Sequence, residues 1–271
     1  MLQAISGLVT VGLLVLSGVV GVRLVRHGRR EGGSAVGLLG LYFLLHGALA
    51  TGLGVATYVG WSSAELALPD AAARALNAGF FVFSTLGLAC LLLFTRRTFR
   101  PASPAAGSLA AGLAMLMAVS VLVLGATEGF EVRVLNGPAY WVHFAARVAC
   151  WAWVAFESFS HWRQQSRRLA LGLADPVVTN RFLLWGLWGA LIALLSFSDP
   201  VARLWYFSLA DTTTRWVPEV GRPIIDATVP VACALDAAAL VLMVLTFFPM
   251  PAYRRWLERR HAASTTGPIA R

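Results

Sequence analysis

The chain has 271 residues, of which 58% are hydrophobic and 13% charged, and its mean hydropathy is +0.70. This composition excludes an ordinary soluble domain. The net charge of +9 comes from arginine, because the chain contains no lysine. The arginines cluster between apolar runs, which is typical of the cytoplasmic loops of membrane proteins and disfavours nucleic acid as a partner.

Seven apolar stretches are long enough to cross a bilayer, which takes about 20 helical residues. In chain order they cover residues 3–25, 34–59, 74–95, 107–126, 139–161, 177–199 and 224–248. The sequence therefore predicts an all-α polytopic membrane protein. We expect one bundle of seven transmembrane helices over residues 1–251 and a short basic tail over residues 252–271.

The loops predict the orientation, because short loops rich in arginine stay in the cytoplasm. The first, third and fifth loops and the tail contain Arg26, Arg29, Arg30; Arg96, Arg97, Arg100; Arg163, Arg167, Arg168; and Arg254, Arg255, Arg259, Arg260. The other loops contain Glu65, Asp70; Glu128, Glu131, Arg133; and Asp211, Arg215, Glu219, Arg222. We expect a multi-pass inner (plasma) membrane protein with its N-terminus outside and its C-terminus in the cytoplasm. No positive charge precedes the first span, so it does not resemble a cleavable signal peptide.

The fifth stretch contains four ionisable residues, His143, Arg147, Glu157 and His161. Their spacing of 4, 10 and 4 residues places them within an arc of about 80° on one helix face. A charge near the membrane centre costs about 2.5–3.5 kcal/mol, so this face is expected to turn toward protein or water. Each residue then either packs against a partner on another helix or lines a ligand site, with Arg147 as the anion anchor. Glu157 is its acidic counterpart but lies about 15 Å away along the axis, too far for direct pairing.

Four further residues are candidates for the same ligand site. His46 and Asp236 each lie twelve residues into their spans, the second and the seventh. Equal depth would permit a hydrogen bond between them, although a lone histidine on an apolar helix is commonly a packed core residue. Trp151 and Trp185 belong to an aromatic set that either fills the core or lines a pocket for an apolar ligand.

The fifth loop is the candidate docking face for a partner. Asp175, followed by Pro176, has the pattern of an N-cap before a proline at the first helical position. Asn180 and Arg181 lie one turn later, at the expected headgroup level. The alternative is that the loop's arginines only orient the protein and bind anionic lipid.

Three stretches resemble a group of uncharacterised bacterial seven-helix integral membrane proteins. They run from Arg168 to Gly186, from Phe247 to Trp256 and from Phe94 to Pro101. More loosely, the layout is similar to the N-terminal seven-helix sensor region of some bacterial histidine kinases. In those proteins a kinase follows the helices, so the resemblance implies that this chain would signal through a separate cytoplasmic protein. It implies no catalytic residues.

Several chemistries lack the residues they need. A retinal pigment needs a Schiff-base lysine, and a seven-helix zinc hydrolase needs a His-x-x-x-His pair in its last span, which has no histidine. Cys90, Cys150 and Cys233 lie inside apolar runs as small core residues. A b-type haem needs two histidines at similar depth, whereas the expected depths of His46 and His143 differ by about 12–15 Å. No catalytic set, metal or cofactor is therefore expected.

The function that these features favour is a membrane sensor or receptor that binds a small ligand or lipid within the bundle. It would signal to a separate cytoplasmic partner. Two alternatives stay open at this point. One is a redox or transport protein that uses the buried His, Glu, Asp and Arg residues as a haem site or proton path. The other is a structural accessory subunit of a larger membrane complex.

Overall fold

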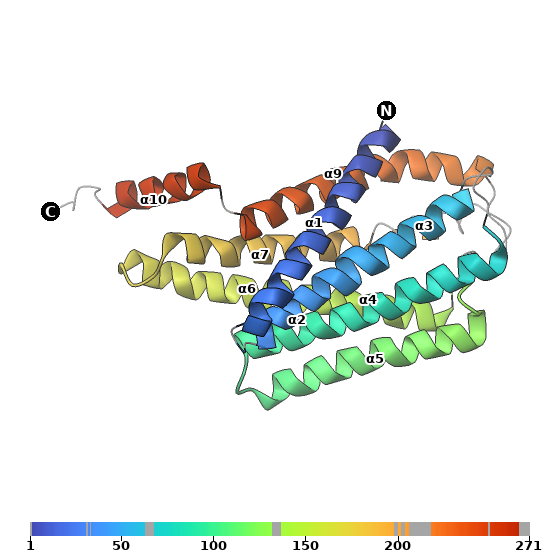
Figure 1. The fold of residues 1–271 in the computed structure, drawn as a ribbon, viewed down its shortest axis with the longest axis horizontal. Coiled ribbons are helices and arrows are strands. Elements are labelled where there is room, and N and C mark those ends of the chain that lie inside the picture. The colour runs from blue at the N-terminus through green and yellow to red at the C-terminus, as the bar shows by residue number, and fades with distance from the viewer. Residues whose placement is uncertain are drawn as a thin grey trace.

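The computed structural model describes residues 2–30, 32, 34–62, 68–131, 137–197, 200–201, 204–205, 218–248 and 250–265, and within these ranges its longer elements are all helices (Figure 1). The elements are α1 (Leu2–Arg30), α2 (Ser34–Tyr42), the π-helical segment η1 (Phe43–Ala50), α3 (Thr51–Ser62), α4 (Asp70–Phe99), α5 (Pro104–Glu128), α6 (Pro138–Ala170), α7 (Pro176–Leu195), α9 (Pro218–Phe247) and α10 (Pro251–Thr265).

Among the residues that the structure describes, six helices are long and apolar enough to cross a membrane. They span Ser6–Arg30, Ala35–Thr57, Asp70–Phe99, Pro104–Glu128, Pro176–Leu195 and Asp226–Phe247. Their outward surfaces are apolar, since Leu8 and Leu122 are each 73% exposed and Met115 is 67% exposed. An apolar exterior of this extent fits contact with lipid chains better than contact with water. The all-helical, membrane-compatible fold predicted from the sequence is confirmed at this level.

The helices form a ring in chain order. Each of α1, α2, α4, α5, α6 and α7 contacts the next of these elements, α7 contacts α9, and α9 returns to contact α1. Inside this ring α4 also contacts α6, η1 and α3. The core is built where these helices meet, around Trp151, Phe43, Leu88, Leu91 and Met117, each fully or almost fully buried. Because α6 lies between α5 and α7 and also touches α4, its polar face is covered by protein.

One glycine allows η1 to approach α4 closely. A Cβ atom added to Gly87 would lie 2.7 Å from both the backbone nitrogen and the Cβ of His46. No larger residue fits there without displacing the π-helical backbone. Gly87 therefore sets the position of His46 against α4.

The hairpin between α6 and α7 is defined by local signals at both of its ends. Gly172 adopts φ +70°, and the Gly172 and Leu173 amides donate to the carbonyls of Leu169 and Arg168. This is a Schellman motif, which ends α6. Asp175 then caps α7, accepting from the amides of Val177 and Val178 at 2.6 and 3.0 Å. The N-cap predicted from the sequence is confirmed.

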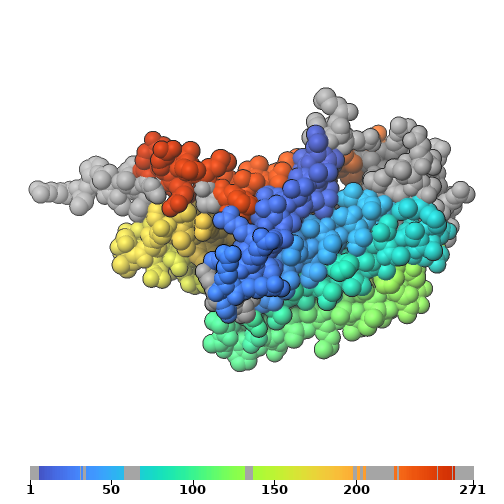
Figure 2. Space-filling view, in the orientation of Figure 1, coloured from blue at the N-terminus to red at the C-terminus, as the bar shows by residue number. Residues whose placement is uncertain are grey.

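Two elements extend further than the apolar runs indicate. Helix α6 continues to Ala170, nine residues beyond the expected end, and at about 1.5 Å per residue it measures about 50 Å. Residues 251–265, expected only as a tail, form α10, which packs against α7. Figure 2 shows the end of the α6–α7 hairpin and α10 projecting beyond the ends of α1, α2 and α4. We call this part, residues 163–181 with α10, the projecting end.

Some sequence expectations lie outside the described residues. These are the loop residues Glu65, Arg133, Asp211 and Arg215, the end of the sixth span at residue 199, and the tail residues 266–271.

Candidate ligand site and its connection to the projecting end

One face of α6 brings a histidine, an arginine and a tryptophan together. His143, Arg147 and Trp151 are spaced four residues apart, so they lie on successive turns of the same face. His143 is 2% exposed and Trp151 is fully buried. The predicted stripe is therefore turned inward at these positions, and Trp151, which the sequence reading assigned to a separate aromatic set, belongs to it.

His143 is held between α4 and α5. Its Nδ1 lies 3.4 Å from the Ser120 hydroxyl, and the edge of the ring meets Phe81 at 5.2 Å between centroids. Ser120 donates its own hydrogen to the Met117 carbonyl at 2.8 Å, so its lone pair faces His143. This arrangement favours the tautomer with the hydrogen on Nδ1, in which Nε2 presents a lone pair. That buried Nε2 atom has no hydrogen-bond partner among the described residues.

His46 enters the same region from η1. Its Nδ1 lies 3.1 Å from the Ser84 hydroxyl of α4, and its ring lies 5.8 Å from that of Trp151. Arg147 and His143 both interact with it electrostatically. π-helical turns inside α-helices are frequent at functional sites, because they re-aim side chains that a regular helix would place elsewhere.

The contacts of the two histidines place them closer in depth than the sequence suggests. His46 meets Ser84 and His143 meets Phe81, and these two residues are one turn apart on α4. The offset of about 12–15 Å, which places each histidine by its distance from the expected end of its span, is larger than these contacts allow. Among the described residues, however, no three metal-ligating side chains come together.

Arg147 has no counter-ion among the described residues. Its guanidinium lies 5.7 Å from the centre of the Phe144 ring, and its Nε is buried without a hydrogen-bond partner. Glu157 is engaged elsewhere, so the sequence reading that it cannot pair with Arg147 agrees with the contacts. A partly buried guanidinium without an anion is costly, which makes Arg147 the least satisfied charge in this part of the bundle.

An aromatic wall borders these polar groups. Trp151 packs edge-on against Tyr42 and Trp188 at 5.5 and 5.3 Å, and Trp185 stacks on Trp188 at 4.7 Å. Phe43 completes the wall against Trp188 at 5.9 Å. The indole N–H groups of Trp151 and Trp185 are buried and unpaired within the described chain. The wall is mostly core packing, and its two N–H groups are the part that could contact a ligand.

Asp236 takes no part in this cluster. The histidine that it matches in depth, His46, bonds to Ser84 instead, and no hydrogen bond or ion pair joins Asp236 to it in the described structure. Asp236 is half-buried on α9, and α9 packs against α1 and α7. The possible His46–Asp236 hydrogen bond is therefore not formed.

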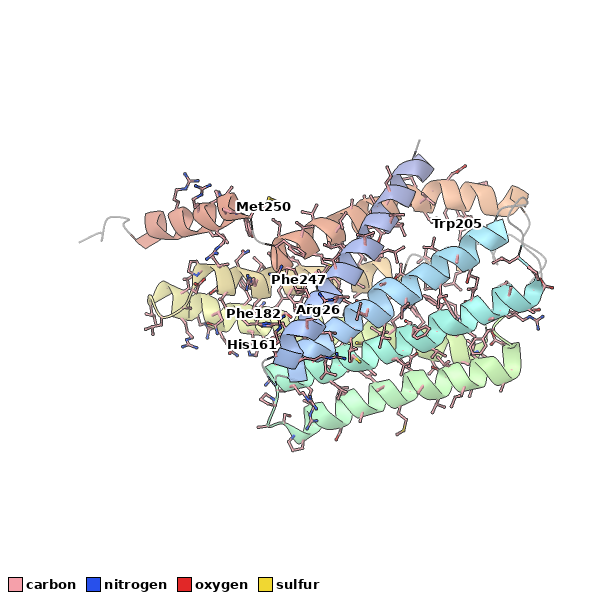
Figure 3. All side chains as sticks on the ribbon, in the orientation of Figure 1. Arg26, His161, Phe182, Trp205, Phe247 and Met250 are labelled. Carbon is pink, nitrogen blue, oxygen red and sulfur yellow. The ribbon has the colours of Figure 1, made fainter. Side chains whose placement is uncertain are left out.

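Glu157 belongs to a second cluster, which lies further along α6. It is 4% exposed and accepts from Arg100 Nε at 3.0 Å with both carboxylate oxygens, and from Trp153 Nε1 at 3.2 Å. Arg100 is the C-cap residue of α4, so this ion pair joins the end of α4 to α6. One turn further, His161 packs on Phe99 of α4 at 4.7 Å and on Phe182 of α7 at 5.8 Å (Figure 3).

The three docking candidates have separate roles. Asp175 caps α7, as described above. Asn180 donates from Nδ2 to the Tyr253 hydroxyl at 2.5 Å, which joins α7 to α10. Arg181 is exposed. Together with exposed arginines around them, these residues lie on the projecting end; those arginines are Arg163, Arg167, Arg168, Arg254, Arg255 and Arg259.

Sequence reasoning missed the partners more than the sites. The sequence pattern predicts only an orienting role for Arg100, and Ser84 and Ser120 lie inside apolar runs that do not mark them as partners. The spacing of Trp153 and Glu157, four residues apart, was a usable signal for their contact. Nothing in the sequence marked the π-helical turn that positions His46.

Comparisons of the chain with protein-family models, with curated proteins and with solved structures found no match.

Proposed function

We propose that this protein is an integral membrane sensor that binds a small ligand among His46, His143, Arg147 and Trp151. The observation that carries the proposal is a set of buried polar atoms on α6 that have no hydrogen-bond partner within the described part of the chain: His143 Nε2, Arg147 Nε and Trp151 Nε1. Buried polar groups are normally paired, and exceptions are concentrated where a ligand, ion or water completes them. A protein that used these residues only for packing would be expected to satisfy them internally.

The proposal includes the topology. Helix α6 crosses the membrane as a seventh span, with its polar face covered by α4, α5 and α7. The N-terminus faces outward, and the projecting end lies in the cytoplasm, because it contains the exposed arginines. The membrane is the inner (plasma) membrane.

Helix α6 offers a direct mechanical connection between the site and the projecting end. The site lies in its first half, the Arg100–Glu157 ion pair lies further along, and the α6–α7 hairpin follows. A ligand that reorients α6 relative to α4 would move the hairpin and, through the Asn180–Tyr253 hydrogen bond, α10. The projecting end is then the docking face for a separate cytoplasmic signalling protein.

The test measures binding and movement in the same protein. A panel of small carboxylates, neutral amides and phospholipids is screened for thermal stabilisation that Arg147→Gln removes. Spin labels at Leu173 and Arg259, both exposed on the projecting end, report the distance between the hairpin and α10 in a variant without native cysteines. The proposal expects that distance to shift on binding, whereas a label pair at Arg97 and Ala105 does not move.

Two results would contradict the proposal. Stabilisation without any change at the projecting end would point to a structural or transport role. A Soret band in the absorption spectrum of the purified protein would replace the sensor with a haem protein, since His46 and His143 approach the same part of α4.

A further inference from the structure

We infer that the ligand of this site is a small organic carboxylate that has a hydroxyl group next to its carboxylate. The inference rests on the proposed function and names the chemical class that its site accepts. Arg147 would bind the carboxylate, and His143 Nε2 would accept the hydrogen of the hydroxyl group.

The charge requirement comes from Arg147. Its guanidinium has no acidic partner in the described structure, since Glu157 is bound to Arg100 and Trp153. Arg147 and the two histidines act on one another in this part of the cluster, and the Met117 backbone of α5 also contacts His143. Toward His143, α4 presents Phe81 and α5 presents Ser120, neither of which is charged. A ligand that completes the site must therefore supply negative charge, and Arg binds carboxylates through charge-assisted hydrogen bonds.

The hydroxyl requirement comes from His143. The contact with Ser120 favours the hydrogen on Nδ1. In that tautomer Nε2, which has no partner among the described residues, accepts a hydrogen bond and does not donate one. A bare carboxylate oxygen would face that lone pair unfavourably. A ligand with a hydrogen-bond donor beside its carboxylate satisfies both residues at once.

The spacing limits the size of the ligand. His143 and Arg147 lie four residues apart on α6, where side chains on neighbouring turns have Cβ atoms about 5–6 Å apart. A carboxylate and a hydroxyl on adjacent carbons match that separation once the two side chains reach toward one another. Trp151 is fully buried one turn further, and its ring lies 5.8 Å from that of His46.

The test uses three probes of similar size: lactate, propionate, which lacks the hydroxyl group, and lactamide, which lacks the charge. Their affinities are measured by calorimetry on the purified full chain at fixed ionic strength. We expect lactate to bind most tightly, propionate about tenfold more weakly, and lactamide not measurably; one hydrogen bond accounts for a difference of that order.

Variants assign each contribution to its residue. Arg147→Gln should abolish binding of both acids, and Arg147→Lys, which keeps the charge, should retain weakened binding. His143→Phe keeps the ring contact with Phe81 and should remove the preference for lactate over propionate. The matched control is Arg23→Gln, because Arg23 also lies over a phenylalanine ring, Phe248 at 5.6 Å, but on α1 and away from the site. It should leave all affinities unchanged.

The failure of this inference can be distinguished from the failure of the proposed function. Equal affinity for propionate and lactate, or tight binding of lactamide, overturns the hydroxy-carboxylate assignment. If another compound of the panel still binds through Arg147 and shifts the projecting end, the sensor proposal stands while this inference fails. If no probe binds and no panel compound does, both fail.

Discussion

The two partners of the Arg100–Glu157 ion pair differ in exposure. The Glu157 side chain is 5% exposed and that of Arg100 is 48% exposed. Removal of Arg100 should therefore cost more stability than removal of Glu157. A solvated arginine tolerates the loss of its partner, whereas a buried carboxylate does not.

Arg100→Ala is expected to destabilise the protein by about 2–3 kcal/mol, since it leaves Glu157 buried with only the Trp153 N–H group. Glu157→Gln should cost about 1 kcal/mol, because the amide still accepts from Trp153 and Arg100 returns to solvent. Unfolding of both single variants and the double variant in detergent measures the difference. Equal losses in the two single variants would contradict the unequal burial of the pair.

Asp175 provides a prediction that is independent of any ligand. Asp175→Ala removes two hydrogen bonds to the start of α7 and should cost about 1 kcal/mol of stability, whereas Asp175→Ser should restore most of it. Neither variant should change the topology, because orientation follows Arg and Lys counts. If Asp175→Ala is as stable as the parent protein, the cap contributes nothing to stability.

Residue patterns predicted local features well and partners poorly. The N-cap at Asp175 could be predicted from Asp175 and Pro176 alone, because capping is a local interaction. The pairing of Glu157 with Arg100 joins residues 57 positions apart, and no periodicity encodes it. Equal depth in the membrane suggests a contact between His46 and Asp236. The arrangement of the helices instead packs η1 against α4, where Ser84 lies.

At the scale of elements, α6 is the helix on which both clusters are built. Its stripe could be predicted because helical spacing fixes which residues share a face. Its end could not be predicted from the apolar run, because the helix continues beyond the hydrophobic residues until Gly172 stops it. Gly172 was the residue from which the end of α6 could have been predicted.

The approach of η1 to α4 gives a prediction for Gly87. Gly87→Ala places a Cβ 2.7 Å from the His46 backbone and should destabilise the protein by about 1–3 kcal/mol, the usual cost of overpacking. It should also weaken ligand binding, because His46 moves with η1. Gly112 on α5 is the control, since no neighbour lies within 4 Å of an added Cβ; Gly112→Ala should be neutral or stabilising. Thermal unfolding of the two variants compares them, and equal effects would argue against close packing at Gly87.

At the scale of the whole molecule, the arginine distribution predicts the orientation. A fluorescent reporter that is silent in the periplasm, fused to the C-terminus, should give signal. The same reporter fused to the N-terminus should be dark. A dark, fully expressed C-terminal fusion would reverse the orientation and place the projecting end outside.

The architecture could be predicted from the sequence more fully than the site. Bilayer thickness sets the length of a membrane-spanning helix, and an apolar composition marks the segments that can contact lipid. The exception is α6, which is not among the six helices apolar enough to qualify as membrane spans on composition. Its polar stripe lowers its hydropathy while lying inside the bundle. We propose that α6 nonetheless crosses the membrane with that stripe turned inward.

Four alanines of α6 test this claim directly in reconstituted vesicles. Ala145 and Ala152 are exposed on the bundle surface, whereas Ala146 and Ala155 are 2% and 7% exposed. Nitroxide labels at each position, in a variant without native cysteines, are probed with oxygen, which dissolves in lipid, and with a water-soluble nickel complex. We expect high oxygen and low nickel accessibility at Ala145 and Ala152, and low accessibility to both at Ala146 and Ala155. High nickel accessibility at Ala145 and Ala152 would place α6 in water and contradict a membrane-spanning α6.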